Sequence, residues 1–202
     1  MIVIVNYGLG NLGSIRNMLT KTGAKSIISS RPDIISRADK LILPGVGSFD
    51  RGMSNLRKLK LIPVINKKVI EEKTPILGIC LGMQLMTKNS QEGELKGLGW
   101  INADTVRFNQ RYDKLKVPHM GWNNIILKKS HDIMNKINRN SRFYFVHSYH
   151  VVCYNDSDIL ATTNYDYNFV SAFQKNNIIG VQFHPEKSHR FGMQLLRNYS
   201  KL

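Results

Sequence analysis

One cysteine of this chain stands in a pattern that suits nucleophilic chemistry. Cys80 lies in Pro75-Ile-Leu-Gly-Ile-Cys-Leu-Gly-Met-Gln84, where an apolar run ends and Gly78 and Gly82 flank the thiol as G-x-C-x-G. This spacing is typical of a nucleophile elbow, a tight strand-to-helix turn that exposes one reactive side chain. Glycines suit both flanks because such a turn leaves no room for side chains. The N-terminus of a helix also favours negative charge, which suits a thiol that must attack.

The other groups that such a thiol needs come near the C-terminus. The segment Val181-Gln-Phe-His-Pro-Glu186 places His184 directly after a predicted strand, with Glu186 two residues on. A lone histidine is more often structural, but a carboxylate at this spacing can orient the ring while it takes and gives protons. The order Cys80, His184, Glu186 therefore predicts a catalytic triad for acyl transfer.

Two glycine loops follow predicted strands. In Pro44-Gly-Val-Gly47, the backbone N–H groups of Gly45, Val46 and Gly47 could stabilise an oxyanion. Alone, this tetrapeptide would be read as a plain turn, but its predicted position beside Cys80 favours the oxyanion role. The second loop, Gly8-Leu-Gly-Asn-Leu-Gly13, matches the dinucleotide fingerprint, with Asp33 as the ribose carboxylate. Asp33 follows Pro32 beyond its strand, which disfavours a dinucleotide-binding oxidoreductase as the alternative.

The composition bounds the remaining functions. The net charge is +15, which could indicate a nucleic-acid-binding module or an anionic membrane surface. The basic residues are scattered and few aromatic residues lie among them, so we expect neither nucleic acid nor membrane as a partner. No apolar run approaches the roughly 18 residues of a membrane span.

Cysteine and histidine spacings argue against a disulfide framework and a metal site. The two cysteines are Cys80 and Cys153, and we interpret the second as a core residue. One working thiol without a disulfide partner suits a cytoplasmic enzyme. No H-x-x-x-H or C-x-x-C spacing occurs, so no metal is expected.

The predicted elements indicate an α/β fold in a single domain over residues 1–202. In the first half, strands alternate with helices, which predicts a doubly wound, mostly parallel central sheet. In the second half, short strands with turns between them predict an antiparallel or mixed extension. The expected strands are 2–5, 25–29, 40–43, 76–79, 100–108, 124–127, 143–146, 151–154, 159–163, 170–174 and 178–183. The expected helices are 14–22, 32–37, 53–72 with a break near Pro63, 81–88 and 192–201.

Taken together, these motifs resemble those of the class I, or triad, glutamine amidotransferases. They are most similar to the glutaminase subunits of imidazole glycerol phosphate synthases, and the resemblance covers essentially the whole chain. The motifs that carry it are Asn6-Tyr-Gly-Leu-Gly-Asn11, Leu43-Pro-Gly-Val-Gly47, Gly78-Ile-Cys-Leu-Gly-Met-Gln84, Glu92-Gly93, Gly97-Leu-Gly-Trp100, Pro118-His-Met-Gly-Trp-Asn123, Phe143-Tyr-Phe-Val-His-Ser-Tyr149 and Gly180-Val-Gln-Phe-His-Pro-Glu-Lys-Ser188.

The resemblance implies the class I glutamine amidotransferase fold and a role for each matching residue. Cys80 would attack the side-chain amide of L-glutamine, with His184 and Glu186 completing the triad and no cofactor needed. The oxyanion and glutamine-binding residues would be Gly45, Val46, Gly47, Leu81, Gly82, Gln84, Glu92, His147, Ser148 and Tyr149. The residues facing a partner would be Asn11, Trp122, Asn123, Tyr144 and Lys187.

The implied partner is a cyclase subunit with a (β/α)8-barrel fold, bound as a heterodimer. Ammonia released from glutamine would pass to it for the synthesis of imidazole glycerol phosphate and AICAR in histidine biosynthesis. Two departures from the family pattern stand out. Asn6 replaces the usual aspartate, and the segment Ser188 to Gly192 resembles a paralogous branch that supplies ammonia for an acetamidino sugar of surface polysaccharides. The sugar pathway is therefore the alternative acceptor.

Overall fold

Five short strands form the parallel part of the central sheet. In spatial order they are β2 (Ser26–Ser29), β1 (Ile2–Val5), β3 (Lys40–Leu43), β4 (Ile76–Ile79) and β13 (Ile178–Val181). Every residue of β1, β4 and β13 is buried. Continuous burial is expected of parallel strands that are covered on both faces. The computed structural model describes residues 1–109 and 116–202.

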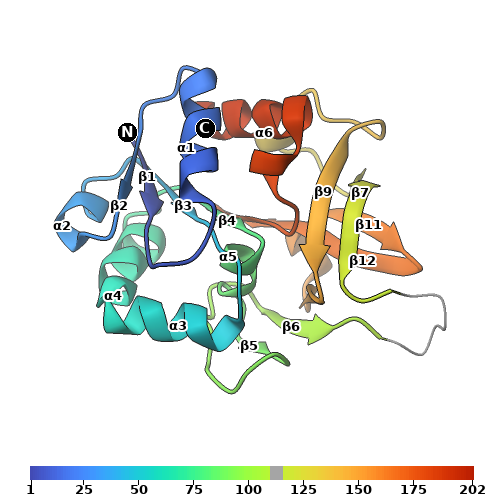
Figure 1. The fold of residues 1–202 in the computed structure, drawn as a ribbon, viewed down its shortest axis with the longest axis horizontal. Helices are drawn as coiled ribbons and strands as arrows, with labels where there is room; N and C mark the ends of the chain where they lie inside the picture. Colours follow the sequence, from blue (N-terminus) through green and yellow to red (C-terminus); the bar gives the residue numbers. More distant parts are fainter. Residues whose placement is uncertain (110–115) are drawn as a thin grey trace.

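Helices cover the two faces of this sheet (Figure 1). Alternate residues of β1 point to opposite sides, so Ile2 and Ile4 join one core cluster while Val3 and Val5 join the other. The Ile2 side packs against α1 (Leu12–Lys21) and α6 (His189–Lys201). The Val3 side packs against α2 (Pro32–Ile35), α3 (Phe49–Lys58), α4 (Leu61–Asn66) and the π-helical turn Lys67–Glu71.

The sheet becomes antiparallel after β13. There β12 (Tyr167–Lys175), β10 (Tyr149–Cys153) and β6 (Ala103–Arg107) follow in order, and β5 (Asn89–Ser90) runs parallel to β6 at the edge. From β12 a branch continues through β11 (Ile159–Tyr165) to β8 (Ile126–Leu127). Short 3₁₀ turns lie at Asp132–Met134, Asp156–Asp158 and Pro185–Lys187.

A separate two-stranded sheet lies beside this branch (Figure 1). It pairs β7 (His119–Asn124) with β9 (Arg142–His147) in antiparallel register. His119 stands opposite His147, and three residues further along β7 Trp122 stands opposite Tyr144.

The predicted fold class is confirmed: a mostly parallel sheet extended by antiparallel strands. The differences include two wrong helix boundaries and one missed strand. The helical break after α3 lies at Lys60, which is left-handed with φ 54°, while Pro63 sits inside the first turn of α4, where no backbone N–H is needed. The helix after Cys80, α5 (Leu81–Gln84), ends at Gln84, because the Gln84 carbonyl accepts from both the N–H and the hydroxyl of Thr87. Strand β7 was missed, since His-Met-Gly-Trp-Asn-Asn lacks an apolar alternation.

Within residues 1–109 and 116–202, no helix has the length and apolar character needed to cross a bilayer.

A buried hydroxyl on the C-terminal helix hydrogen-bonds to the sheet, and removing it tests how much this bond stabilises the packing of the helix. Tyr199 Oη donates to the backbone oxygens of Leu41 and Pro75, from two neighbouring strand starts. Tyr199→Phe is expected to lower the free energy of unfolding by about 1–3 kcal/mol, because buried carbonyls lose their donor. The matched control Ser200→Ala removes a hydroxyl that bonds only within its own helix, to Arg197 O. Urea unfolding of both variants checks this, and equal losses would contradict the proposed anchor.

Candidate active site

Cys80 occupies a strained turn between β4 and α5. Its backbone has φ 53° and ψ −110°, a conformation that a residue with a side chain rarely adopts. A Cβ at Gly82 would lie 1.8 Å from the Leu43 carbonyl oxygen, and one at Gly78 would lie 2.8 Å from the Gly82 oxygen. Both flanking glycines are therefore required by close backbone approach, and the turn holds the thiol out at the end of the sheet.

His184 and Glu186 reach Cys80 from the neighbouring strand. Strand β13 runs parallel to β4 with Val181 opposite Ile79, so the chain that leaves β13 passes beside the elbow. His184 Nδ1 and Glu186 Oε1 are 2.8 Å apart, and these side chains are only 1% and 2% exposed. Among the residues that the structure describes, His184 Nε2 has no hydrogen-bond partner within normal distance.

The charge state of His184 follows from these neighbours. Burial lowers the pKa of this ring, but its interactions with the neighbouring Cys80 and Glu186 outweigh burial and raise the pKa to about 10. At neutral pH the ring is therefore an imidazolium. Such a group beside a thiol can protonate the leaving nitrogen of an amide and can later act as a base.

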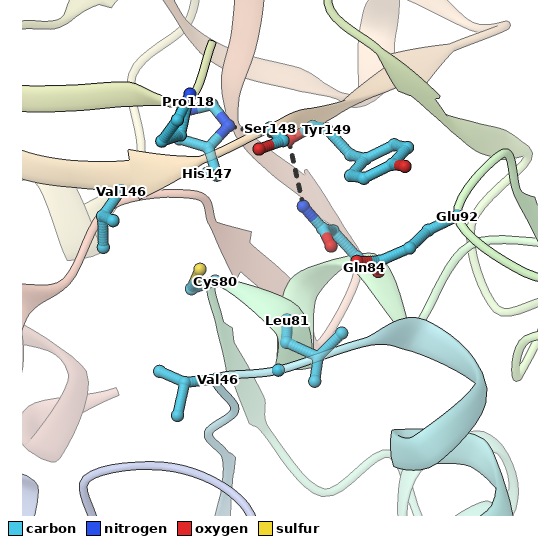
Figure 2. Close-up of a pocket in the computed structure, with 11 residues that line it drawn as sticks. Val46, Cys80, Leu81, Gln84, Glu92, Pro118, Val146, His147, Ser148 and Tyr149 are labelled. Atoms are coloured by element: carbon cyan, nitrogen blue, oxygen red, sulfur yellow. Dashed lines mark hydrogen bonds between the residues drawn. The ribbon is translucent and has the colours of Figure 1, made fainter.

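Cys80 opens into a cavity of about 420 Å³ (Figure 2). It is lined by Val46, Gly47, Cys80, Leu81, Gln84, Glu92, Pro118, Val146, His147, Ser148 and Tyr149. Eight of the ten residues expected to bind the oxyanion or glutamine lie in this wall. The other two, Gly45 and Gly82, are buried behind it, where Cβ atoms would meet neighbouring backbone or Tyr7.

The loop after β3 approaches the thiol from one side of the cavity. Gly47 has φ +117°, a conformation that favours glycine, and Val46 is exposed at the cavity wall. Across from it, the Leu81 N–H belongs to the first turn of α5, where backbone donors have no partner within the helix. The buried Tyr7 hydroxyl donates to Pro44 O and so fixes the loop from behind. Sequence reasoning did not single out Tyr7, although its place at a strand end was a usable signal.

A buried amide chain runs along the cavity wall. Gln84 Nε2 donates to Tyr149 O and to Gln182 Oε1, both at 3.1 Å, and Gln182 Nε2 donates to Cys80 Sγ at 3.6 Å. Gln182 is fully buried and was missed by the sequence analysis. Its signal was a polar residue within the apolar run 181–183.

Glu92 places a carboxylate at the far side of the cavity. Its Oε2 accepts the Phe49 N–H at 2.8 Å. Burial raises the pKa of this carboxyl; the Phe49 hydrogen bond lowers it and the nearby Asp50 raises it further. A partly buried carboxylate with an open oxygen suits a substrate group that donates hydrogen bonds.

Of the residues expected to face a partner, Trp122, Tyr144 and Lys187 form a contiguous outer cluster, whereas Asn123 lies on the opposite face of β7 and Asn11 lies apart. Trp122 and Tyr144 meet edge to face at 6.0 Å, and Lys187 Nζ lies 5.5 Å from the Tyr144 ring centroid. Asn123 follows Trp122 on β7. Asn11 lies at the N-terminus of α1, a helix that contacts the turn 185–187.

The alternative readings of the sequence find little support in the geometry. The Asp33 carboxylate is bound by the Arg31 guanidinium, and a Cβ at Gly10 would lie 3.1 Å from Pro44, so the 8–13 loop packs against the active-site loop. Within the described residues, no group of three or more His, Cys, Asp or Glu side chains could hold a metal ion. At the unusual Asn6, the side-chain oxygen accepts the Gly8 N–H, a turn bond that an aspartate could also make.

Comparison with known proteins finds a matching family model, full-length relatives and solved structures with a similar fold. A family model described as Glutamine amidotransferase class-I matches residues 3–201. Imidazole glycerol phosphate synthase subunit HisH 2 of Methanococcus maripaludis is 58% identical, over all of this chain and 99% of the relative. The protein of the same name from Pseudomonas aeruginosa is 50% identical over the full length of both. One chain in the structure of PurLQS from Thermotoga maritima has a similar fold, with a TM-score of 0.70, 17% identity, and coverage of 98% of this chain and 96% of that one.

The buried ion pair predicts an unusual titration. The His184 Hε1 resonance in a histidine-labelled sample is expected to titrate near pH 10. Because this pKa is raised above the ordinary 6.5, the stability it contributes is complete below pH 6.5 and is lost as the pH rises towards 10. Glu186→Gln removes one cause of the rise and should move the titration to lower pH. Glu72→Gln, at an exposed carboxylate paired with Lys68, is the control; an unmoved titration in Glu186→Gln would contradict the assignment.

Proposed function

The chain belongs to the class-I glutamine amidotransferase family, and we propose that it is the glutaminase subunit of an imidazole glycerol phosphate synthase. The observation that carries the proposal is the strained Cys80 elbow at the floor of a cavity, with the buried His184–Glu186 pair behind it. Full-length relatives of that name at 58% and 50% identity support the same assignment.

The geometry supports an order of events at these groups. With its proton held on His184, Cys80 Sγ attacks the side-chain carbonyl carbon of glutamine as the thiolate, and the oxygen that becomes negative lies towards the N–H groups of Gly47 and Leu81. His184 gives its proton to the leaving nitrogen, so that ammonia departs and a thioester remains. Water then attacks the thioester with His184 as base, which releases glutamate and restores the thiol.

The remaining wall residues suit the amino-acid end of glutamine. The Glu92 carboxylate offers an acceptor for the α-ammonium group, and the backbone around Ser148 and Tyr149 offers polar atoms opposite the Gln84 amide. We assign Gln182 to holding the thiol and Gln84 together, since it bonds both.

The outer cluster of Trp122, Tyr144 and Lys187, together with the half-buried Asn123, is proposed to contact a (β/α)8-barrel cyclase subunit in a heterodimer. Direct transfer of ammonia across such an interface has a chemical reason. Ammonia that escaped into water at neutral pH would be mostly protonated and would no longer be a nucleophile. We propose that residues 1–202 act as one domain in the cytoplasm, in line with two cysteines that form no disulfide.

The assignment of Cys80 as the nucleophile predicts that glutamine-dependent and ammonia-dependent synthesis respond differently when this residue is replaced. In the complex with its cyclase partner, Cys80→Ala is expected to lower glutamine-dependent product formation by about three orders of magnitude or more, because the nucleophile is lost. Synthesis supplied with ammonium salt at alkaline pH should be retained, since the cyclase is untouched. Cys153→Ala is the matched control, because burial raises the pKa of that thiol to about 12 and it lies outside the cavity. Full glutaminase activity in Cys80→Ala would refute the mechanism.

The acceptor pathway can be tested in cells. Expression of this chain is expected to restore growth without histidine to a strain that lacks its own glutaminase subunit but keeps a compatible cyclase, because only the ammonia supply is missing. The Cys80→Ala variant, expressed at the same level, is the negative control. Glutaminase activity in vitro without rescue would favour the acetamidino-sugar pathway.

A further inference from the structure

Three side chains of β7 and β9 form a chain of bonds that ends at the cavity. Asn123 Nδ2 lies 3.3 Å from His119 Nε2, and His119 Nδ1 lies 3.1 Å from His147 Nε2. His147 Nδ1 then lies 2.7 Å from the Tyr149 carbonyl oxygen, in the cavity wall. The chain of bonds thus begins at the half-buried Asn123, on the face of β7 opposite to Trp122, and ends at the substrate pocket.

The chemistry of these atoms fixes the direction of every bond. A carbonyl oxygen can only accept, so His147 Nδ1 carries the proton and His147 Nε2 accepts. His119 must then donate from Nδ1 and accept at Nε2 from the Asn123 amide, which is a donor. Burial lowers the pKa of His119 to about 4 and that of His147 well below its ordinary value, so both rings are neutral at physiological pH. Protonation of either ring would set two N–H groups against each other.

The chain of bonds ends on an atom that already matters to the pocket. The Tyr149 oxygen that accepts from His147 also accepts from Gln84 Nε2 (Figure 2). His147 itself lines the cavity, whereas His119 is 3% exposed and does not. The catalytic steps above give His119 no role.

His119 is held rigidly enough to transmit a change. Its ring stacks on Tyr165 with centroids 4.0 Å apart and on Phe145 at 4.8 Å. Asn123, at the other end, is only half buried, and its amide also donates to Asn164 O at 2.9 Å. A partner group that bonds the Asn123 amide would therefore change the hydrogen bond that His119 Nε2 accepts from Asn123.

We propose that His119 is a positioning residue that holds His147 and the Tyr149 carbonyl in place, and that Asn123 couples this arrangement to partner docking. The proposal rests on the glutaminase function proposed above. When the Asn123 amide is bound to both His119 and a docked partner, the pocket wall is ordered for glutamine. Without the partner, the hydrogen bonds of Asn123, His119 and His147 are held only by other residues of this chain.

His119→Phe tests the proposal, since it keeps an aromatic ring in the stack and removes both ring nitrogens. It is expected to raise KM for glutamine by about three- to tenfold, the range of one or two lost hydrogen bonds. It should also reduce the ratio of glutaminase turnover with partner to turnover without it. His150→Phe is the matched control. This ring is equally buried, contacts the same Phe108 and has its pKa lowered to about 4, but it bonds Tyr167 and Val151.

A second variant covers the case in which His119→Phe folds poorly. His119→Asn places an amide donor near the position of Nδ1, so His147 keeps its partner while Asn123 loses its acceptor. KM in the free subunit should stay close to that of the wild type, while stimulation by the partner falls. Asn123→Ala should reduce stimulation in the wild-type background and have no added effect in His119→Asn. Additive effects would overturn the coupling.

The outcomes separate this inference from the function on which it rests. A wild-type chain without glutaminase activity in the presence of partner would end the proposed function. An active and stimulated wild type, with His119→Phe indistinguishable from His150→Phe in KM and stimulation, would end only the positioning role.

Discussion

The contact between the Gly82 backbone and the Leu43 carbonyl is the constraint on which the site depends. No Cβ can stand at Gly82, since it would lie 1.8 Å from the Leu43 oxygen. One residue pair further, a Cβ at Gly45 would meet Leu81 at 2.8 Å. The elbow and the loop after β3 are therefore packed backbone against backbone. The thiol and the backbone donors proposed for its oxyanion are thereby held close together, which is what preorganised electrostatic catalysis requires.

The neighbours of His184, and not its burial, give this histidine its charge. Desolvation would leave His184 neutral, as it does for the buried His119 and His147. The Cys80 thiol and the Glu186 carboxylate reverse this: Glu186 lies two residues further along the same segment, and Cys80 is brought in by the long-range pairing of β4 with β13. His119, His147 and His184 are all buried, but of these three rings His184 has the carboxylate and the thiol beside it. These two groups therefore give His184 a charge that the other two rings lack.

Patterns in the sequence predicted the features that depend on residues close together in the chain. The strands at Ile2–Val5 and Ile76–Ile79, the glycines beside Cys80 and the spacing of His184 and Glu186 all depend on a few adjacent residues. The parts that were missed depend on register between distant segments. Gln182 looks like a stray polar residue until pairing sets it beside Cys80, and β7 becomes a strand only by facing β9. The residues from His119 to Asn124 show no strand-like alternation from which that pairing could have been predicted.

The two-stranded sheet lies between the outer cluster and the cavity, because β9 lines the cavity with Val146 and His147 and also carries Tyr144. A lone pair of strands is marginal in stability, so its position depends on what packs against it. On β9, the Tyr144 carbonyl accepts the His184 N–H at 2.9 Å, and the Tyr144 N–H donates to Ser188 at 3.0 Å. The peptide groups of Tyr144, whose ring stands in the outer cluster, thus hold the backbone of His184 both directly and through Ser188. Strand β9 therefore holds His184, and β7 holds the His147 ring through His119, whereas Cys80 is held by the central sheet.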